Sequence, residues 1–164
     1  LLMCRVGKKV SFSKLSRLVD VGDDAIKRYV GYLEEAFLLT LVEQDGTPNE
    51  RKYGLKKCYA PDTGICSVIS GLADTGPLAE NAVYLKLARN SEPRFFDRGG
   101  AEIDFLCGGK AYEVKYKKKL GENDMQPIEG LSKRGIHEKV LVSRREKSDK
   151  TPIKISPLWE FLLS

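Results

Sequence analysis

The segment EIDFLCGGKAYEVKYKKK, residues 102–119, limits most strongly what this chain can fold into. Apolar and charged residues alternate through both of its halves, and Gly108 and Gly109 separate the halves. Because successive side chains of a strand point to opposite faces, each half predicts a strand. Two glycines between such runs are typical of a tight turn. The segment therefore predicts a hairpin of two antiparallel strands.

Charged side chains gather on one face of each predicted strand. Strict alternation divides the first strand into a face with Glu102, Asp104 and Leu106 and a face with Ile103, Phe105 and Cys107. On the second strand, Glu113 and Lys115 share a face. A hairpin closed at the two glycines would bring Asp104 close to Glu113.

These charges have two possible roles. They can form the solvated face of a sheet, which is the ordinary place for a Glu-x-Lys on a strand. Alternatively, two neighbouring carboxylates destabilise a sheet unless a cation relieves them, and carboxylate oxygens are the ligands that Mg²⁺ prefers. In that case Lys115 would orient a water molecule or stabilise charge that builds up on a phosphate.

Composition excludes several other classes of protein. The 164 residues are enough for one ordinary domain or two small ones, and 41% hydrophobic with 31% charged residues indicates a globular chain. The chain contains no run of 18 apolar residues, so the sequence predicts no membrane-spanning helix. Four scattered cysteines and a single histidine, His137, argue against a zinc site and a histidine-dependent nucleophile. We expect reduced thiols in a cytoplasmic protein and an exposed His137 beside a loop glycine.

The first part of the chain predicts a winged helix, residues 1–60. A helix would begin at Ser11 or Ser13 with an apolar stripe of Leu15, Leu18 and Val19. After a turn at Gly22, a helix over residues 23–39 would bury Ile26, Tyr29 or Val30, Leu33 and Phe37, with an Asp24–Arg28 ion pair. Strands over residues 38–44 and 56–62 would follow, joined by a polar loop over residues 45–55.

The net charge of +5 fits a polyanionic partner without requiring one. The second helix would present Lys27 and Arg28 to DNA phosphates. The wing would add Arg51, Lys52, Lys56 and Lys57. The alternative is a docking module, since Glu34 and Glu35 oppose a purely basic helix face.

The second part, residues 61–164, predicts an α/β (α+β) domain with a mixed sheet flanked by helices. A joint with a short buried helix leads to a helix over residues 78–90, with Leu78, Ala82, Leu85 and Ala88 or Arg89 along one side. Strand-like and helix-like patterns follow along the rest of this part. They are strands over 94–98, 101–107 and 111–116, a helix near Pro127, strands over 138–145 and 153–156, and a helix over 157–163.

The order helix, three strands, helix, strand, together with Asp104 and the Glu113-x-Lys115 pattern, resembles the PD-(D/E)xK nuclease core of restriction enzymes and archaeal Holliday-junction resolvases. The resemblance implies that the catalytic residues are Glu80, Asp104, Glu113 and Lys115. It also implies that Glu80, Asp104 and Glu113 bind Mg²⁺, or alternatively Mn²⁺. Gln126 falls in the following helix, where some relatives carry a glutamine near the site.

Five longer blocks extend the resemblance from residue 10 to the end of the chain. They are KRYVGYLEEAFLL, KKCYAPDTGI, LAENAVYLKL, AEIDF and YEVKY. In order and spacing they are similar to the C-terminal region of archaeal-type AAA+ ATPases, the DUF4143/DUF234 group. This implies an ATPase domain N-terminal to a fragment that starts at Leu1. No GxxxxGK[ST] loop is present, so we expect no ATP hydrolysis by these residues alone.

The sequence thus predicts a metal-dependent DNA endonuclease, the C-terminal portion of an ATPase, acting on double-stranded or branched DNA. A homodimer would suit a branched substrate, since resolvase-like relatives act as dimers. Lys117, Lys118 and Lys119 would form a phosphate-binding rim beside the metal, although such a run is also typical of a solvated strand end. The alternative from another class is a non-catalytic module that binds DNA or docks a protein and regulates an AAA+ ATPase.

Overall fold

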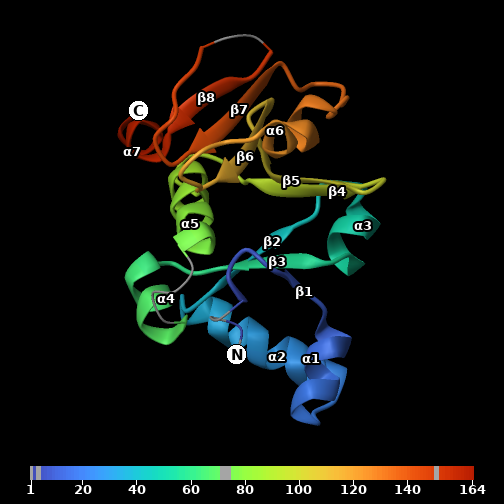
Figure 1. Cartoon of the computed structure of the whole chain (residues 1–164). Coiled ribbons are helices and arrows are strands. Elements are labelled where there is room, and N and C mark those ends of the chain that lie inside the picture. Colours follow the sequence, from blue (N-terminus) through green and yellow to red (C-terminus); the bar gives the residue numbers. More distant parts are fainter. Residues whose placement is uncertain (1, 3–4, 71–74, 150–151) are drawn as a thin grey trace. The chain divides into compact units, whose positions relative to one another are not determined.

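The computed structural model describes residues 2, 5–70, 75–149 and 152–164 (Figure 1). The chain divides into two compact units, Leu1–Ala73 and Asp74–Ser164. Each unit has its own sheet, three-stranded in the first and five-stranded and mixed in the second. The predicted domain boundary between residues 60 and 61 lies before this division. The short helix of the predicted joint therefore belongs to the first unit.

The first unit is a small sheet with helices between and after its strands. Its elements are β1 (Lys9–Val10), α1 (Phe12–Val19), α2 (Asp23–Glu35), β2 (Thr40–Glu43), α3 (Pro48–Tyr53), β3 (Lys56–Tyr59) and α4 (Thr63–Ser70). The strands are antiparallel in the order β1-β3-β2. The two helices and the β2–β3 pair occur where the sequence predicts them. The short strand β1 has no clear signal in the sequence.

Helix α3 lies where the sequence predicts only a loop. Thr47 caps it, since its hydroxyl accepts a hydrogen bond from the Glu50 amide at 3.3 Å, and Glu50 accepts one from the Thr47 amide at 2.7 Å. This reciprocal arrangement is a capping box, and Pro48 is well suited to the first helical turn. The sequence Thr47-Pro48-x-Glu50 is therefore a helix signal, within a segment whose polar, turn-rich composition predicts a loop.

The core of the first unit uses fewer apolar residues than the periodicity predicts. Its buried members are Val10, Leu15, Ile26, Val30, Leu39 and Cys58. Leu18, Val19 and Phe37 are exposed, so their predicted burial is wrong, and Phe37 is 82% exposed. Helix α2 ends at Glu35, and Phe37 takes a positive φ of 55° in the turn toward β2. The helical spacing therefore stops before it reaches Phe37.

Helix α4 forms as predicted, but it is not the buried helix that its apolar sequence indicates. Val68 is 86% exposed, and Ile65 and Ile69 are also exposed. Cys66 is the buried apolar residue on this helix among those that the structure describes. The apolar content of α4 therefore marks a surface rather than a core.

The second unit follows the predicted order of elements closely. It comprises α5 (Thr75–Ala88), β4 (Arg94–Arg98), β5 (Ala101–Cys107), β6 (Lys110–Lys115), α6 (Glu122–Glu129), β7 (Glu138–Ser143), β8 (Lys154–Pro157) and α7 (Leu158–Leu163). The sheet order is β4-β5-β6-β7-β8. The first three strands are antiparallel neighbours, whereas β6, β7 and β8 are parallel.

Helices cover both faces of this sheet. Ala111 packs with Ile128 and Leu131, which form part of the core cluster around α6. The next residue, Tyr112, points to the opposite face and meets Phe161 of α7 with ring centroids 5.7 Å apart. Helices α5 and α7 contact each other on that face. The strands are thus buried between α6 on one side and α5 with α7 on the other.

The buried face of α5 differs from the predicted one. The structure buries Ala79, Asn81, Val83 and Tyr84, whereas Leu78, Ala82 and Leu85 are half-buried. Apolar residues are spread around α5, so their spacing singles out no face. Tertiary packing, including Tyr84 against Phe105 of β5, fixes the orientation of the helix.

Candidate active site

A β-bulge in β5 shapes the site. Arg94 pairs with Leu106 and Phe96 with Ile103, so β5 contains one more residue than β4 between these two pairs. Asp104 and its neighbour lie within the irregularity. The bulge places Ile103 and Leu106 in the same core cluster, which overturns the strict alternation predicted for this strand. Bulges re-aim side chains and are frequent next to active sites.

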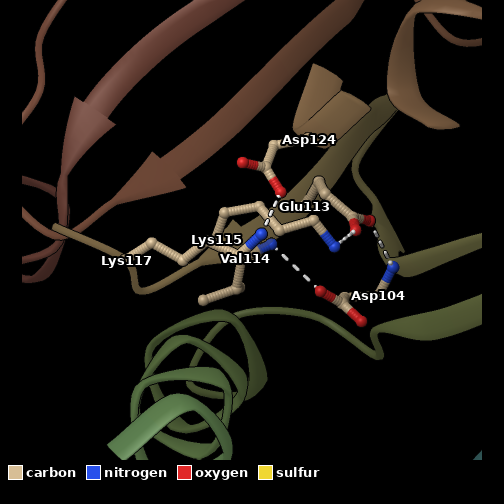
Figure 2. A network of polar contacts seen from close by, with 6 residues as sticks. All are labelled: Asp104, Glu113, Val114, Lys115, Lys117 and Asp124. Atoms are coloured by element: carbon tan, nitrogen blue, oxygen red, sulfur yellow. Dashed lines mark hydrogen bonds and ion pairs between the residues drawn. The ribbon is translucent and has the colours of Figure 1, made fainter. Parts of the chain in front are cut away.

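The bulged strand brings Asp104 and Glu113 together, as the hairpin predicts. The Asp104 amide donates a hydrogen bond to Glu113 Oε2 at 3.3 Å, and the Val114 amide donates one to Asp104 Oδ2 at 2.9 Å (Figure 2). The paired positions of β5 and β6 end at Phe105 and Tyr112. Immediately beyond them, each carboxylate therefore accepts a hydrogen bond from the backbone of the other strand.

Burial gives these carboxylates unusual electrostatics. Asp104 is 9% exposed and Glu113 only 3%. Burial, with repulsion from Asp104 as the next cause, raises the pKa of Glu113 to about 7, although the Lys115 ammonium opposes the shift. Glu113 is therefore poised between its protonated and charged forms near neutral pH.

Lys115 is the cation of this cluster. Its Nζ lies 2.5 Å from Glu113 Oε1 (Figure 2). Burial lowers the pKa of Lys115, but the Glu113 carboxylate, together with Asp104 and Asp124, outweighs burial, so the net shift is upward. Lys115 is thus a permanent positive charge at neutral pH and not a base that could accept a proton.

The three side chains face a polar cavity of about 550 Å³. The residues that line it are Gly99, Gly100, Ala101, Glu102, Asp104, Glu113, Lys115, Gln126 and Pro127. Gln126 reaches the cavity from α6, as the family resemblance implies, and its Nε2 donates to Asn123 Oδ1 at 3.1 Å. Glu102 also lines the cavity. The alternation of the sequence places Glu102 on the same strand face as Asp104.

Asp124 is a residue of this region that sequence reasoning missed. It is 8% exposed at the start of α6, and its Oδ1 lies 2.5 Å from Lys117 Nζ (Figure 2). A hydrogen bond of 2.9 Å from the Gly121 amide, followed by the contact with Lys117, lowers the pKa of Asp124. An acid three residues after a glycine at a helix start was the available signal. Lys117, predicted to bind DNA, is thus held in an ion pair.

Glu80 differs from the other predicted catalytic residues. It is half-buried on α5 and is not among the residues that line the cavity. Within residues 2, 5–70, 75–149 and 152–164, no three or more His, Cys, Asp or Glu side chains are arranged to hold a metal ion. The structure therefore brings together Asp104, Glu113 and Lys115, and the role of Glu80 as a third ligand stays a prediction.

The predicted DNA contacts separate into a buried group and an accessible group. Lys56 and Lys57 are buried in β3, at 8% and 1% exposure, so the prediction that they hold phosphates is wrong. Lys56 instead lies 2.9 Å from Glu43 of β2. The remaining predicted contacts are exposed or half-buried, namely Lys27, Arg28, Arg51, Lys52, Lys118 and Lys119.

Two smaller predictions concern the charge pair on α2 and the histidine. Asp24 pairs with Lys27 at 3.2 Å and not with Arg28, the predicted partner. Both spacings place two side chains on neighbouring turns of a helix, so either pairing was open to this sequence. His137 is exposed, as predicted.

A second cavity, in the first unit, has the opposite chemistry. It measures about 390 Å³ and its lining is almost wholly apolar. The residues that line it are Leu2, Leu15, Val19, Ile26, Tyr29, Val30, Leu33, Leu38, Leu39, Ile65 and Ile69. It lies between α1, α2 and α4 and contains no carboxylate or amine.

Comparison with known proteins informs the first unit only. A family model described as a domain of unknown function (DUF8612) matches residues 1–76. No curated protein and no solved structure matches the chain. Across the part of the chain that the structure describes, no helix combines the length and the apolar character needed to cross a membrane. The resemblance to AAA+ ATPases and to PD-(D/E)xK nucleases therefore stays a prediction.

Proposed function

We propose that the second unit is a PD-(D/E)xK-like nuclease domain that hydrolyses phosphodiester bonds in DNA with the help of Mg²⁺. The observation that carries this proposal is the meeting of Asp104, Glu113 and Lys115 at one polar cavity, where a bulge of β5 interrupts regular pairing. A solvated sheet face, the alternative role for these charges, would leave the carboxylates exposed, whereas both are buried.

The architecture of the second unit supports the same proposal. Helix α5, three antiparallel strands, α6 and a strand parallel to β6 follow in the order that the nuclease core requires. For the first unit we propose a winged helix, supported by α1, α2 and the β2–β3 hairpin beside β1. The short helix α3 between the wing strands is an addition to that arrangement.

The donor set at the cavity fits a hard divalent cation. Two buried carboxylates lie on adjacent strands, and their repulsion contributes to the raised pKa of Glu113. A cation bound between them would relieve that repulsion. Mg²⁺ commonly uses one or two protein carboxylates and completes its shell with water and substrate phosphate, so Glu80 is not required for a first ion. When bound, Mg²⁺ or Mn²⁺ supplies charge stabilisation at the phosphate and a lowered pKa of water.

Lys115 would act on the substrate as a fixed cation. Because its pKa is raised, it keeps its proton and can donate hydrogen bonds to a phosphate oxygen as negative charge builds there. Water adds to the phosphorus, one P–O bond breaks, and a phosphate end and a hydroxyl end result. Glu113 orients Lys115 through their 2.5 Å contact, and the backbone amide of Val114 orients Asp104.

The test is cleavage of labelled duplex, single-stranded and four-way-junction DNA in Mg²⁺, Mn²⁺ or EDTA, with wild type and Asp104→Asn side by side. We expect metal-dependent cutting by the wild type and its loss in the variant, whose amide oxygen can still accept the Val114 hydrogen bond. Unchanged DNA affinity and melting temperature would show that only the chemistry was lost. Cleavage that survives Asp104→Asn would rule out this site.

A second candidate function rests on the apolar cavity of the first unit. A cavity lined by exposed and buried apolar side chains between three helices suits protein docking better than DNA. The whole chain would then be a non-catalytic module that regulates an AAA+ ATPase, with homodimerisation as a further proposal. Binding of DNA without cutting under every metal condition would favour this candidate over the nuclease.

A further inference from the structure

A third cavity, of about 590 Å³, lies in the second unit where its parallel strands end. Its lining residues are Tyr116, Arg144, Arg145, Leu158, Trp159 and Leu162. Tyr116 follows β6, the two arginines follow β7, and the others belong to α7, which follows β8 (Figure 1). Ligands of parallel sheets commonly bind in crevices at the carboxyl ends of the strands.

The lining combines flat apolar surfaces with positive charge. Trp159 is 61% exposed, and the Arg144 guanidinium carbon lies 5.6 Å from the centre of the Tyr116 ring. Among the described residues, no carboxylate forms an ion pair with Arg144 or Arg145. Two arginines without an acidic partner beside an exposed indole are the elements of a site for an unpaired base and its phosphate.

The cavity and the candidate active site meet the end of β6 from the two faces of its sheet, since α6 lines the active-site cavity and α7 lines this one. Lys115 lines the active-site cavity and the next residue, Tyr116, lines this one. Their Cα atoms are about 3.8 Å apart because they are neighbours in sequence. Lys118 and Lys119 follow, both exposed. A nucleic-acid strand bound at Lys115 would reach these basic and aromatic groups by passing around the end of β6.

We infer that this aromatic–arginine cavity binds an unpaired nucleotide of the strand that is cut at the neighbouring site, an inference that rests on the proposed nuclease function. The base stacks on Trp159, while Arg144 and Arg145 contact its phosphates. Stacking tolerates any base, so the cavity selects for single-stranded or frayed structure and not for sequence. The substrate of the active site is accordingly DNA with an unpaired segment, such as a branch or an end.

Trp159 offers a direct readout because it is the single tryptophan of the chain. We would titrate the full chain in EDTA with a fluorescein-labelled oligothymidylate, read by anisotropy, and with the unlabelled strand, read by tryptophan emission. We expect quenching of Trp159 on binding. The double variant Arg144→Gln/Arg145→Gln should bind at least tenfold more weakly and show a shallower dependence on salt, because it contacts fewer phosphates. Trp159→Ala should weaken binding by a similar factor.

Arg134→Gln is the matched control, since Arg134 is an exposed arginine of the same unit that lines neither cavity. It should change affinity by less than twofold. Melting temperatures would confirm that every variant folds. Binding with unchanged Trp159 emission, or an equal loss of affinity in Arg134→Gln, would overturn the inference while leaving metal-dependent cleavage untouched. Absence of both binding and cleavage would overturn the inference and the proposed function together.

Discussion

The two units of this chain differ most in the chemistry of their cavities. In the first unit, α1, α2 and α4 enclose a cavity of about 390 Å³ with an apolar lining. In the second, β5, β6 and α6 enclose one of about 550 Å³ that holds Asp104, Glu113 and Lys115. Apolar surface favours association with another apolar surface, whereas buried charge is costly unless it is paired and hydrogen-bonded. The contrast is the basis for proposing chemistry in the second unit and association in the first.

Two strand lysines extend the comparison, one buried (Lys56) and one half-buried (Lys115). Lys56 of β3 lies against Glu43, and Lys115 of β6 lies against Glu113, so both units contain a lysine–glutamate pair. The pair in the second unit borders a polar cavity, while Lys56 lines neither cavity. Two similar contacts thus have different expected consequences. In the first unit we expect the pair to stabilise the sheet. In the second we expect Glu113 to hold the Lys115 ammonium at the proposed site.

The largest effect is expected from exchanging these lysines for methionine. Lys115→Met should reduce cleavage by roughly 100-fold or more, because it removes a fixed charge aimed at the phosphate. Lys56→Met should leave cleavage intact and lower the free energy of unfolding by about 1–2 kcal/mol. Single-turnover cleavage and urea unfolding measure the two outcomes. Equal losses of activity in both variants would break the comparison.

A smaller effect concerns pH and the carboxyl of Glu113. Its pKa is raised from 4.5 to about 7 in the folded protein, so the folded state holds a proton that the unfolded chain releases earlier. The stability that this proton contributes is present below about pH 4.5 and is lost as the pH rises through about 7, by about 3 kcal/mol at most. Glu113→Gln should flatten this slope between pH 5 and 8. A slope that persists in Glu113→Gln, followed by urea unfolding, would assign it to other groups.

The smallest effect is expected on the exposed face of α4. Val68 is 86% exposed, so Val68→Ser should change the free energy of unfolding by less than about 0.5 kcal/mol and leave cleavage unchanged. If the first unit docks a partner, the same substitution should reduce that association. A loss of cleavage in Val68→Ser, measured beside the wild type, would show that the first unit takes part in the chemistry.

Local patterns in the sequence predict much of the second unit. Strands β4 and β5 have the predicted bounds because short runs with apolar residues lie between proline and glycine punctuation, and β5 also alternates charged with apolar residues. The position of the turn at Gly108 and Gly109 was enough to predict that Asp104 and Glu113 lie close together. The bulge of β5 could not be predicted, because it is defined by the pairing of β5 with β4 and has no signal within β5 itself.

Burial is the property that the sequence conveys least well. Lys56 and Lys57 read as exposed wing charges, yet β3 is the central strand of its sheet and buries both. The reverse holds for Val68, an apolar residue left exposed. Glu80 lies on the predicted helix but does not line the cavity. Apolar residues occur all around α5, so the sequence does not indicate which side of the helix faces the sheet.

The most direct test of the central claim, that Asp104 and Glu113 together hold a divalent cation, is calorimetric titration of the chain with Mn²⁺ at pH 6 and pH 8. Binding should be tighter at pH 8, and at pH 6 it should be accompanied by release of a proton, because Glu113 must be deprotonated to act as a ligand. Asp104→Asn and Glu113→Gln should each abolish it. Equal heats of binding in the wild type and both variants would contradict the account.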